Sequence, residues 1–359
     1  MSGVGAWVRY GDPLGREEVD FAVRHYRVAI LQPWEAEAAE RLKQERPDMT
    51  VLAYRCLSSA RDFEPPQRCA SGLTFDELCQ RDWLARRRDG SLVEWSSYPG
   101  HFQARVWEPG YRARWVEQVC EDIAGTAFDG VMSDNDVFED YYDLDLPLEG
   151  VEDAASLRRV LDGFVEQVGW GLAGVGKILV PNIAEARREP GRWEHHASWG
   201  GGFDECWLGW GEATLFDEPT SLAQVHELDG PGLSVVRTPD GGGGRCPHPL
   251  YGLAAFWVFG AGEGAYTATG HDDYSRTPWF PALDADLGAP VGAPHRQAGV
   301  WVREFEGGTA AVVLDPDRGG EVELAPGMVR PGPQGRPDGE PLPRRVALAP
   351  HHGLLALRP

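Results

Sequence analysis

The sequence predicts an α/β protein, with a (β/α)8 TIM barrel over residues 1–295 and a small antiparallel β domain over residues 299–359. Three observations support this fold class. Short strand-like runs alternate with helical patterns, which is typical of a parallel sheet. Eight such runs precede the tail, and eight is the number that closes a barrel. After residue 298 the strand patterns continue without any helical pattern between them.

The eight strand candidates are short runs rich in apolar residues. Several are continuously apolar rather than alternating, as expected for strands that are covered on both faces. We expect the barrel to close before about residue 265. In chain order the candidates are residues 6–9, 28–31, 51–54, 128–133, 178–180, 206–208, 233–236 and 253–259.

Helical patterns separate these strands. Within residues 111–124 the apolar side chains recur at i, i+3, i+4 and i+7, which places them on one face of a helix. The same spacing runs over three turns in residues 157–168. A shorter, more polar helix is expected over residues 35–46, and another over residues 220–228 with Thr220 as its N-cap.

A long segment, residues 58–110, interrupts this alternation after the third strand. Loops of that length in compact domains are usually functional. We predict that it covers the C-terminal face of the barrel and forms one wall of a cleft. Aromatic side chains favour this role, namely Trp83, Trp95, His101, Phe102 and Trp107.

The tail predicts a series of antiparallel strands. Residues 300–305 and 309–314 flank Glu306-Gly307-Gly308, which is typical of a hairpin. Further strand patterns occur at residues 321–324, 345–348 and 353–357. We therefore expect a β domain packed beside the barrel.

Composition excludes several classes of partner. The 34 lysines and arginines against 56 aspartates and glutamates give a net charge of −22. A negative field of this size repels phosphate groups, which argues against nucleic acid and anionic membranes. No apolar run reaches the roughly 20 residues that span a bilayer. The N-terminal residues show no secretion signal, so we expect a cytoplasmic protein, or a secreted one if a leader was removed.

The six cysteines lie far apart and form no Cys-x-x-Cys pair. A zinc or iron–sulfur site is therefore not expected. The sequence implies no metal and no cofactor.

Functional groups in a barrel project from the carboxyl ends of its strands. The fourth strand runs into Asp134-Asn135-Asp136, and such acids at the end of an apolar run suggest a site. The sixth strand carries Glu205 among aromatic residues. Other strand ends and their loops supply the residues that we expect to bind substrate, namely Tyr10, Trp34, Arg55, Asp136, Asn182, Trp210 and Arg237.

Two carboxylates beside a cleft are what glycoside hydrolysis requires. One must protonate the leaving oxygen, and the other must attack the anomeric carbon or activate water. Asp134 and Glu205 are the candidate pair. Two structural alternatives stay open, since Asp134 suits a turn at a strand end and Glu205 suits a solvated acid before a strand.

Two further functions remain possible at this point. A catalytically silent carbohydrate-binding barrel would keep the aromatic cleft without a reactive pair of carboxylates. A metal-dependent hydrolase would use Asp134, Asp136 and a histidine. The absence of a His-x-His pattern after the first strand argues against the metal enzyme.

The order of these motifs resembles that of the bacterial barrels called hypothetical glycosyl hydrolase family 15. It is more distantly similar to the family 114 endo-α-1,4-polygalactosaminidases. The matching pieces are Gln32-Pro33-Trp34-Glu35, Val51-Leu52-Ala53-Tyr54, Phe128-Asp129-Gly130-Val131 with Ser133-Asp134-Asn135, Val180-Pro181-Asn182 and Asp286-Leu287-Gly288-Ala289-Pro290.

The resemblance implies a barrel that acts on an oligosaccharide or polysaccharide. In the family 114 pattern an Asp on the fourth strand and a Glu on the sixth form the acidic pair, which correspond to Asp134 and Glu205. It also favours retention, with Asp134 as nucleophile and Glu205 as acid/base. Carboxyl groups about 5–5.5 Å apart indicate retention, and about 6.5–9.5 Å inversion. Trp207 and Trp210 would then supply the desolvation that raises the pKa of the acid.

Overall fold

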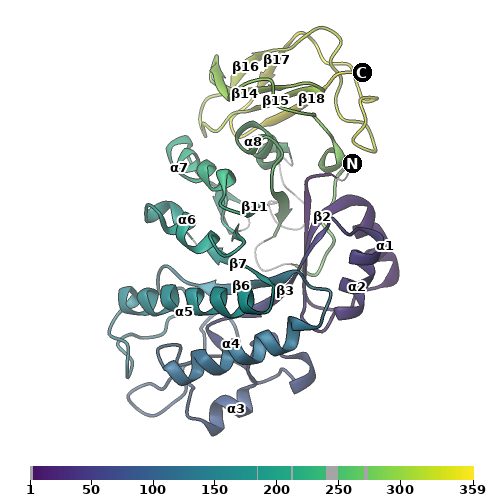
Figure 1. Ribbon diagram of the computed structural model, residues 1–359. Coiled ribbons are helices and arrows are strands. Elements are labelled where there is room, and N and C mark those ends of the chain that lie inside the picture. Colours follow the sequence, from purple (N-terminus) through teal and green to yellow (C-terminus); the bar gives the residue numbers. More distant parts are fainter. Residues whose placement is uncertain (1–2, 184, 212, 240–249, 271–273) are drawn as a thin grey trace. The chain divides into compact units, whose positions relative to one another are not determined.

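The computed structural model describes residues 3–183, 185–211, 213–239, 250–270 and 274–359 (Figure 1). The chain divides into two compact units. The terminal unit comprises Met1–Ala29 together with Asp204–Pro359, and the central unit comprises Ile30–Phe203. The domains expected from the sequence, residues 1–295 and 299–359, are continuous stretches of the chain, whereas the terminal unit combines two separate stretches.

Eight strands form a closed barrel, which confirms the predicted fold class. Their order around the barrel is β1-β12-β11-β8-β7-β6-β3-β2, with parallel pairing along the strands. Strands β2 and β8 each cross a boundary between the two units. The bounds are β1 Gly5–Arg9, β2 Tyr26–Leu31, β3 Thr50–Cys56, β6 Gly130–Asp136, β7 Ile178–Ile183, β8 Gly201–Asp204, β11 Leu233–Pro239 and β12 Ala265–Thr269.

Helices connect these strands as the apolar spacing predicts. Two long helices, α4 and α5, lie side by side in the central unit (Figure 1). Among the described residues, no helix is long and apolar enough to cross a membrane. The helices are α1 Arg16–His25, α2 Ala36–Glu45, α3 Phe75–Gln80, α4 Pro109–Ala124, α5 Ala154–Gly174, α6 Arg192–Ala197, α7 Glu218–Gln224 and α8 Leu250–Gly260, with short 3-10 turns at Pro66–Arg68, Ala186–Arg188, Val225–Asp229 and Pro281–Asp284.

The expected eighth strand, residues 253–259, is wrong, because these residues lie in α8. The eighth strand is β12, so the barrel closes at Thr269 rather than before residue 265. Nine of the eleven residues of α8 are buried, and the helix contacts both β12 and the antiparallel sheet of the tail. A helix covered on all sides has no polar face, so its sequence looks like a buried strand.

The expected sixth strand, residues 206–208, is also displaced, since the strand is β8. Its first two residues are glycines, which have low strand propensity. A Cβ at Gly202 would lie 2.7 Å from the Trp193 ring, so close packing explains the glycine there. As a consequence, Glu205 follows its strand instead of lying within it.

The N-cap of α7 is Asp217 rather than Thr220, because Asp217 Oδ1 accepts a 2.9 Å hydrogen bond from the Thr220 backbone N–H. The helix therefore begins earlier than expected and ends at Gln224, where a 3-10 turn continues the chain. Two-residue strands, β9 Gly209–Trp210 and β10 Thr214–Leu215, precede it.

The tail forms antiparallel sheets, as predicted. One sheet has the order β13-β14-β15-β18, and β16 pairs with β17 in a second. Alternate residues of β15 enter two cores, one against α8 and one on the opposite face of the sheet. The bounds are β13 His295–Gln297, β14 Val300–Phe305, β15 Gly308–Val312, β16 Gly320–Glu323, β17 Arg345–Leu348 and β18 Gly353–Leu357.

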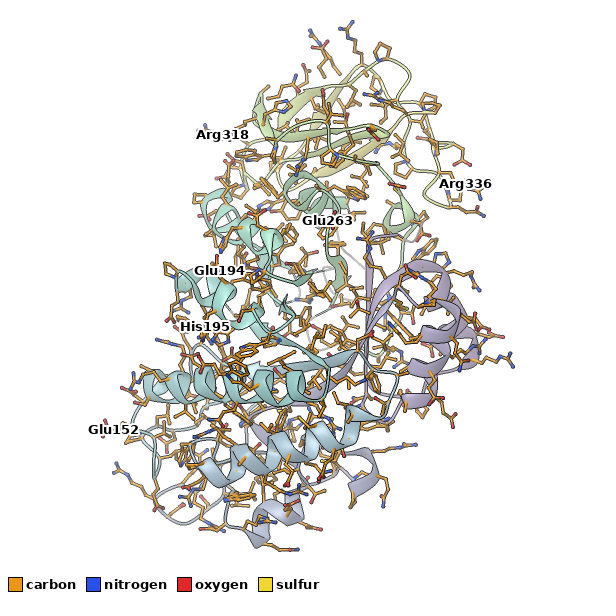
Figure 2. The ribbon with its side chains drawn as sticks, viewed as in Figure 1. Glu152, Glu194, His195, Glu263, Arg318 and Arg336 are labelled. Carbon is orange, nitrogen blue, oxygen red and sulfur yellow. The ribbon has the colours of Figure 1, made fainter. Side chains whose placement is uncertain are left out.

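A buried cluster of charged groups joins β6 to two helices of the central unit. Asp136 at the end of β6 pairs with Arg192 at 2.8 Å and with the His196 ring at 2.8 Å. Asp162 on α5 pairs with the same two residues at 2.7 and 3.2 Å. On α6, Glu194 and His195 are exposed (Figure 2), whereas Arg192 and His196 face inward. The cluster therefore ties three elements together through compensated charges.

This cluster predicts how stability depends on pH. Burial alone would lower the pKa of His196, but the Asp136 and Asp162 carboxylates outweigh it and raise this pKa to about 9. Stabilisation by His196 is then fully present below its unfolded pKa, about 6.5, and is lost as pH rises through 9. Urea denaturation should show the free energy of unfolding falling by up to roughly 3 kcal/mol across this window.

The control is His196→Asn, which lacks the titrating ring. Its stability should fall less than that of the wild type between about pH 6.5 and about pH 9. Parallel curves for the two proteins would show that folding does not raise the pKa of His196.

Candidate active site

A bulge in β6 separates its two acids. Ser133 pairs with Pro181 of β7, but Asp136 pairs with Ile183, so β6 contains one extra residue over this stretch. Asn135 has a φ of 69°, a left-handed conformation that asparagine tolerates better than most residues. In a regular strand, residues 134 and 136 would face the same side. The extra residue reverses the alternation, so Asp134 and Asp136 enter different surroundings.

Asp134 is half-buried and accepts hydrogen bonds from three donors. The Tyr54 hydroxyl on β3 donates to Oδ2 at 2.9 Å. The Asn182 amide on β7 donates to Oδ1 at 2.9 Å, and the Asn135 backbone N–H donates to the same oxygen at 2.8 Å. Hydrogen bonds donated to a carboxylate stabilise its charged form. The structure thus brings Asp134 and Asn182 together, as two of the predicted site residues.

The 58–110 insertion contacts the end of β6 that carries Asp134. Besides α3 and the first 3-10 turn, its elements are β4 Ser59–Arg61 and β5 His101–Gln103. The Ser58 hydroxyl donates to the Asn135 carbonyl at 2.9 Å, and Arg61 donates to the Tyr54 hydroxyl at 3.0 Å. These contacts place the insertion against the candidate nucleophile within the central unit.

Aromatic rings of the insertion extend this contact. Trp95 stacks on Tyr142 with ring centroids 3.7 Å apart and an interplanar angle of 4°. The Tyr142 hydroxyl in turn donates to the Asn135 side-chain oxygen. Tyr98 packs against both rings, and His101 packs against Trp95. The loop that follows β6 is thus fixed to the insertion beside Asp134.

Two predicted substrate-binding residues lie in buried ion pairs instead. Arg55 is 3% exposed and pairs with Asp122 of α4 at 2.7 Å, because it faces the opposite side of β3 from Tyr54. Asp136 is 1% exposed and belongs to the cluster with Arg192 and His196. Arg55 and Asp136 therefore make structural contacts, and their charged groups are not exposed.

The same cluster is the one metal-like group among the described residues. Ligand atoms of Asp136, Asp162 and His196 lie within 4.8 Å of one another. Arg192, however, already donates to both carboxylates and supplies the positive charge that a cation would bring. Asp134 is not part of the group. Within the part of the chain that the structure describes, the geometry therefore does not support a metal site made of Asp134, Asp136 and a histidine.

Glu205 directly follows β8 in the terminal unit and is half-buried. The Tyr274 hydroxyl donates to Glu205 Oε1 at 2.6 Å. Burial, and then the charge of Glu205, raise the pKa of Tyr274 well above its usual value, so the phenol keeps its proton as a donor. The Tyr274 hydroxyl thus holds the Glu205 carboxylate in position.

Arg237 on β11 holds the backbone beside Glu205. It is 0% exposed and donates from one terminal nitrogen to the Glu205 carbonyl at 3.2 Å. Its other donors reach the Thr269 carbonyl and hydroxyl, at 2.6 and 3.1 Å, at the end of β12. We expect from the sequence that Arg237 binds substrate. In the structure it is buried, and its hydrogen bonds hold the loop that carries Glu205.

The three remaining predicted residues are aromatic. The Tyr10 ring meets the Tyr274 ring edge-on at 5.1 Å, and the Tyr10 backbone N–H donates to the Tyr274 carbonyl at 2.8 Å. In the terminal unit, Tyr10 therefore contacts the tyrosine that donates to Glu205, and Arg237 contacts the Glu205 backbone. Trp210 in β9 is 37% exposed, and Trp34 is half-buried in the turn after β2.

Three functional candidates, Tyr54, Arg61 and Tyr274, were not singled out from the sequence. Tyr54 ends the third predicted strand, directly before Arg55. The two-residue period of β3 could have identified it, because Tyr54 shares a face with Leu52 and Cys56, whereas Arg55 lies on the other face. Arg61 and Tyr274 lie outside the barrel strands, where no spacing rule relates them to a strand end.

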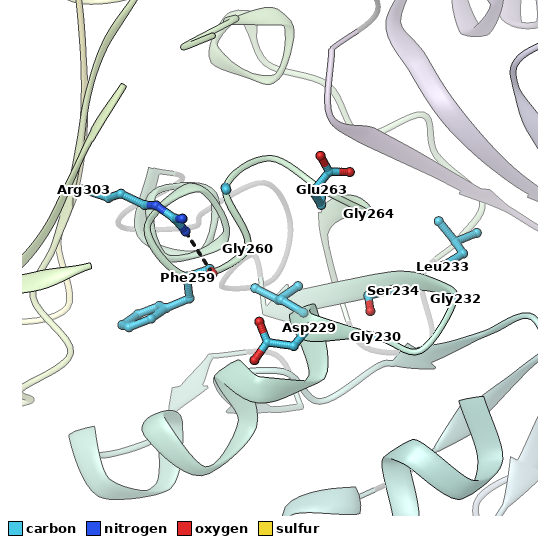
Figure 3. A pocket seen from close by; sticks show the side chains of 12 residues that line it. Asp229, Gly230, Gly232, Leu233, Ser234, Phe259, Gly260, Glu263, Gly264 and Arg303 are labelled. Atoms are coloured by element: carbon cyan, nitrogen blue, oxygen red, sulfur yellow. Dashed lines mark hydrogen bonds between the residues drawn. The ribbon is translucent and has the colours of Figure 1, made fainter. Parts of the chain in front are cut away.

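A pocket of about 520 Å³ lies elsewhere in the terminal unit (Figure 3). It is lined by Leu233 and Ser234 at the amino end of β11, and by Gly264 just before β12. Arg303 crosses it to donate to the Phe259 carbonyl at the end of α8. Catalytic groups of barrels lie at the carboxyl ends of the strands, so this pocket is not the candidate active site.

Comparison with solved structures shows the same fold. An α-amylase from Thermotoga neapolitana aligns with a TM-score of 0.55 at 9% identity, covering 99% of each chain. An α-amylase from Geobacillus thermoleovorans, solved with acarbose, gives 0.51 at 12% identity, covering 99% of this chain and 98% of that one. Ega3 from Aspergillus fumigatus, solved with galactosamine, gives 0.46 at 11% identity, covering 77% and 94%. At these identities the likeness to the two α-amylases concerns the fold alone.

A search of curated proteins found no match. The model of one protein family, by contrast, matches residues 43–309, which is more than half of the 359-residue chain. That span includes β3, β6 and β7, with Tyr54, Asp134 and Asn182, and it also includes Glu205. The chain therefore belongs to the hypothetical glycosyl hydrolase family 15.

Proposed function

We propose that the protein is a retaining glycoside hydrolase that acts on an oligosaccharide or polysaccharide, with Asp134 as nucleophile and Glu205 as acid/base. The observation that carries the proposal is the environment of Asp134, whose carboxylate accepts three hydrogen bonds at the end of β6. Membership of a glycosyl hydrolase family supports the class of reaction. The acidic chain makes a strongly anionic polysaccharide an unfavourable substrate.

The proposed reaction has two steps. Asp134 attacks the anomeric carbon while Glu205 gives its proton to the departing glycosidic oxygen, which leaves a glycosyl ester on Asp134. Glu205 then takes a proton from water, and the resulting attack at the anomeric carbon releases the sugar and restores the Asp134 carboxylate. Tyr54 and Asn182 hold the attacking carboxylate in one orientation through both steps.

Local contacts hold both acids in position for their proposed roles. Asp134 is held by donors, which suits a group that must be charged when it attacks. Glu205 accepts a hydrogen bond from the Tyr274 hydroxyl, and its backbone is braced by Arg237. A well-positioned carboxyl that can gain and lose a proton is what the acid/base role needs.

Asp134→Asn and Glu205→Gln should each reduce kcat by about a thousandfold or more, because each removes a group that takes part in bond making or breaking. A panel of aryl glycosides and polysaccharides identifies the substrate, and rates on that substrate give the comparison. Melting temperatures should stay close to that of the wild type.

Matched controls exist for both substitutions. Asp143 is an exposed acid of the loop after β6 with a φ of 54°, a conformation that asparagine accepts, and Glu263 is an exposed acid of the terminal unit. Asp143→Asn and Glu263→Gln should leave kcat unchanged. Undiminished activity in either Asp134→Asn or Glu205→Gln would refute the assigned role of that residue.

The stereochemical course gives a separate prediction. Attack by Asp134 followed by attack of water inverts the anomeric carbon twice, so the first product should have the configuration of the substrate. Proton NMR of a freshly started reaction distinguishes the anomers before they equilibrate. A first product of opposite configuration would show a single displacement by water and would make Asp134 a base.

A further inference from the structure

Arg61 lies in the insertion and points to the phenol that contacts Asp134. Its side chain is 12% exposed. One terminal nitrogen donates to the Tyr54 hydroxyl at 3.0 Å, and the guanidinium carbon lies 5.5 Å from the centre of the Tyr54 ring. The Tyr54 hydroxyl donates in turn to Asp134 Oδ2 at 2.9 Å. A continuous chain of hydrogen bonds therefore links a cation to the candidate nucleophile.

The direction of this chain follows from the chemistry of its members. A guanidinium has donors and no acceptor, so the Tyr54 oxygen must accept from Arg61. A carboxylate has acceptors and no donor, so the single phenolic proton must point to Asp134. Arg61 therefore fixes the rotation of the Tyr54 hydroxyl, and hydrogen bonds in such a chain strengthen one another.

Arg61 itself is held firmly. Glu64 accepts from it at 2.8 Å and is 6% exposed. The second oxygen of Glu64 accepts from the Ser71 backbone N–H at 3.1 Å and from the Ser71 hydroxyl at 2.8 Å. Burial alone would lower the pKa of Arg61, but Tyr54, Cys56 and Glu64 raise it overall, so the guanidinium stays charged.

Two other titratable groups nearby, His101 and Cys56, are neutral near pH 7. Burial and the charge of Arg61 lower the pKa of His101, which pairs with Arg61 across β4 and β5, to about 4. Burial raises the pKa of the Cys56 thiol, which accepts a hydrogen bond from the Asn135 amide. Among the described residues of this part of the central unit, Arg61 is a cation that reaches Asp134 through the Tyr54 hydroxyl.

We propose that Arg61 is a positioning residue that acts through Tyr54, orienting its phenolic proton toward Asp134 and stabilising the charged carboxylate. The proposal rests on the proposed role of Asp134 as nucleophile. It gives the insertion a part in the reaction, since residues 58–110 deliver the cation as well as covering the strand end. The expected consequence is a carboxylate that stays charged and aligned at lower pH than it would without Arg61.

Carbon NMR of protein labelled at the aspartate carboxyl groups tests the proposal without turnover. Asp134→Asn identifies the signal of Asp134, and its titration gives the pKa of that group. Arg61→Met and Tyr54→Phe should each raise the pKa of Asp134, because each removes stabilisation of its charge. Arg105→Met, which removes a different arginine of the insertion paired with Glu108, should not.

Two further variants test the route. If Arg61 acts through Tyr54, then Arg61→Met should change the pKa of Asp134 much less in a Tyr54→Phe background. Glu64→Gln keeps Arg61 and Tyr54 but removes the partner that holds Arg61, and it should shift the Asp134 signal less than Arg61→Met does. Additive shifts, or an equal shift in Glu64→Gln, would overturn the proposed route.

Kinetics give the readout that a purely structural role would not produce. In Arg61→Met, kcat should fall by about tenfold to a hundredfold, with KM within about twofold of the wild type. The acidic limb of the kcat/KM profile should move to higher pH. Arg61→Lys, which keeps the charge and a donor, should recover most of both changes. Equal losses in Arg61→Lys and Arg61→Met would contradict the proposal.

The outcomes separate the two proposals. An unchanged pKa of Asp134 in a folded Arg61→Met protein refutes the role of Arg61, whatever the activity of Asp134→Asn. A raised pKa supports the role of Arg61 in stabilising the carboxylate, even if Asp134→Asn remains active. An active Asp134→Asn protein would instead refute the role of Asp134 as nucleophile.

Discussion

One extra residue in β6 determines which of two neighbouring acids is available for chemistry. Because β6 gains a residue relative to β7 between Ser133 and Asp136, the side-chain alternation reverses at Asn135. Asp134 then meets Tyr54 and Asn182, whereas Asp136 enters the buried cluster with Arg192 and His196. The same local irregularity thus creates the candidate nucleophile position and an anchor for α5 and α6.

The insertion completes this arrangement. A carboxylate on a strand end needs donors that keep it charged, and β3 and β7 supply Tyr54 and Asn182 as side-chain donors to Asp134. Arg61 adds a cation one hydrogen bond further away, and the Trp95–Tyr142 stack fixes the neighbouring Asn135. A long loop can therefore supply a charge that the regular barrel strands do not place beside Asp134.

Much of the fold could be predicted because it depends on local patterns. The helical spacing in α4 and α5 and the hairpin β14–β15 follow from sequence periods and turn residues. The errors arise where surroundings override those patterns. Helix α8 lacks a polar face because it is covered on all sides, and β8 has a glycine at residue 202 because the Trp193 ring packs against it.

The candidate site was only partly predictable for a related reason. Strand ends drew attention to Asp134, Asn182 and Glu205, since the carboxyl ends of parallel strands share one face. A bulge has no reliable signature in one sequence, so the sequence alone predicts one site for Asp134 and Asp136. Strand ends alone favour Arg55, although the two-residue period of β3 places Arg55 and Tyr54 on opposite faces. Partners that come from outside the barrel strands, such as Arg61 and Tyr274, depend on long-range packing.

The central claim is that the Asp134 carboxylate bonds directly to sugar during turnover. A 2-deoxy-2-fluoro glycoside of the sugar identified by screening, with a good leaving group, slows release of the glycosyl ester so that it accumulates. Peptide mapping by mass spectrometry then locates the added mass. If Asp134 is the nucleophile, the label should lie on the peptide that contains Asp134, with none in Asp134→Asn. A label on another carboxylate, or continued turnover without any labelled peptide, would contradict it.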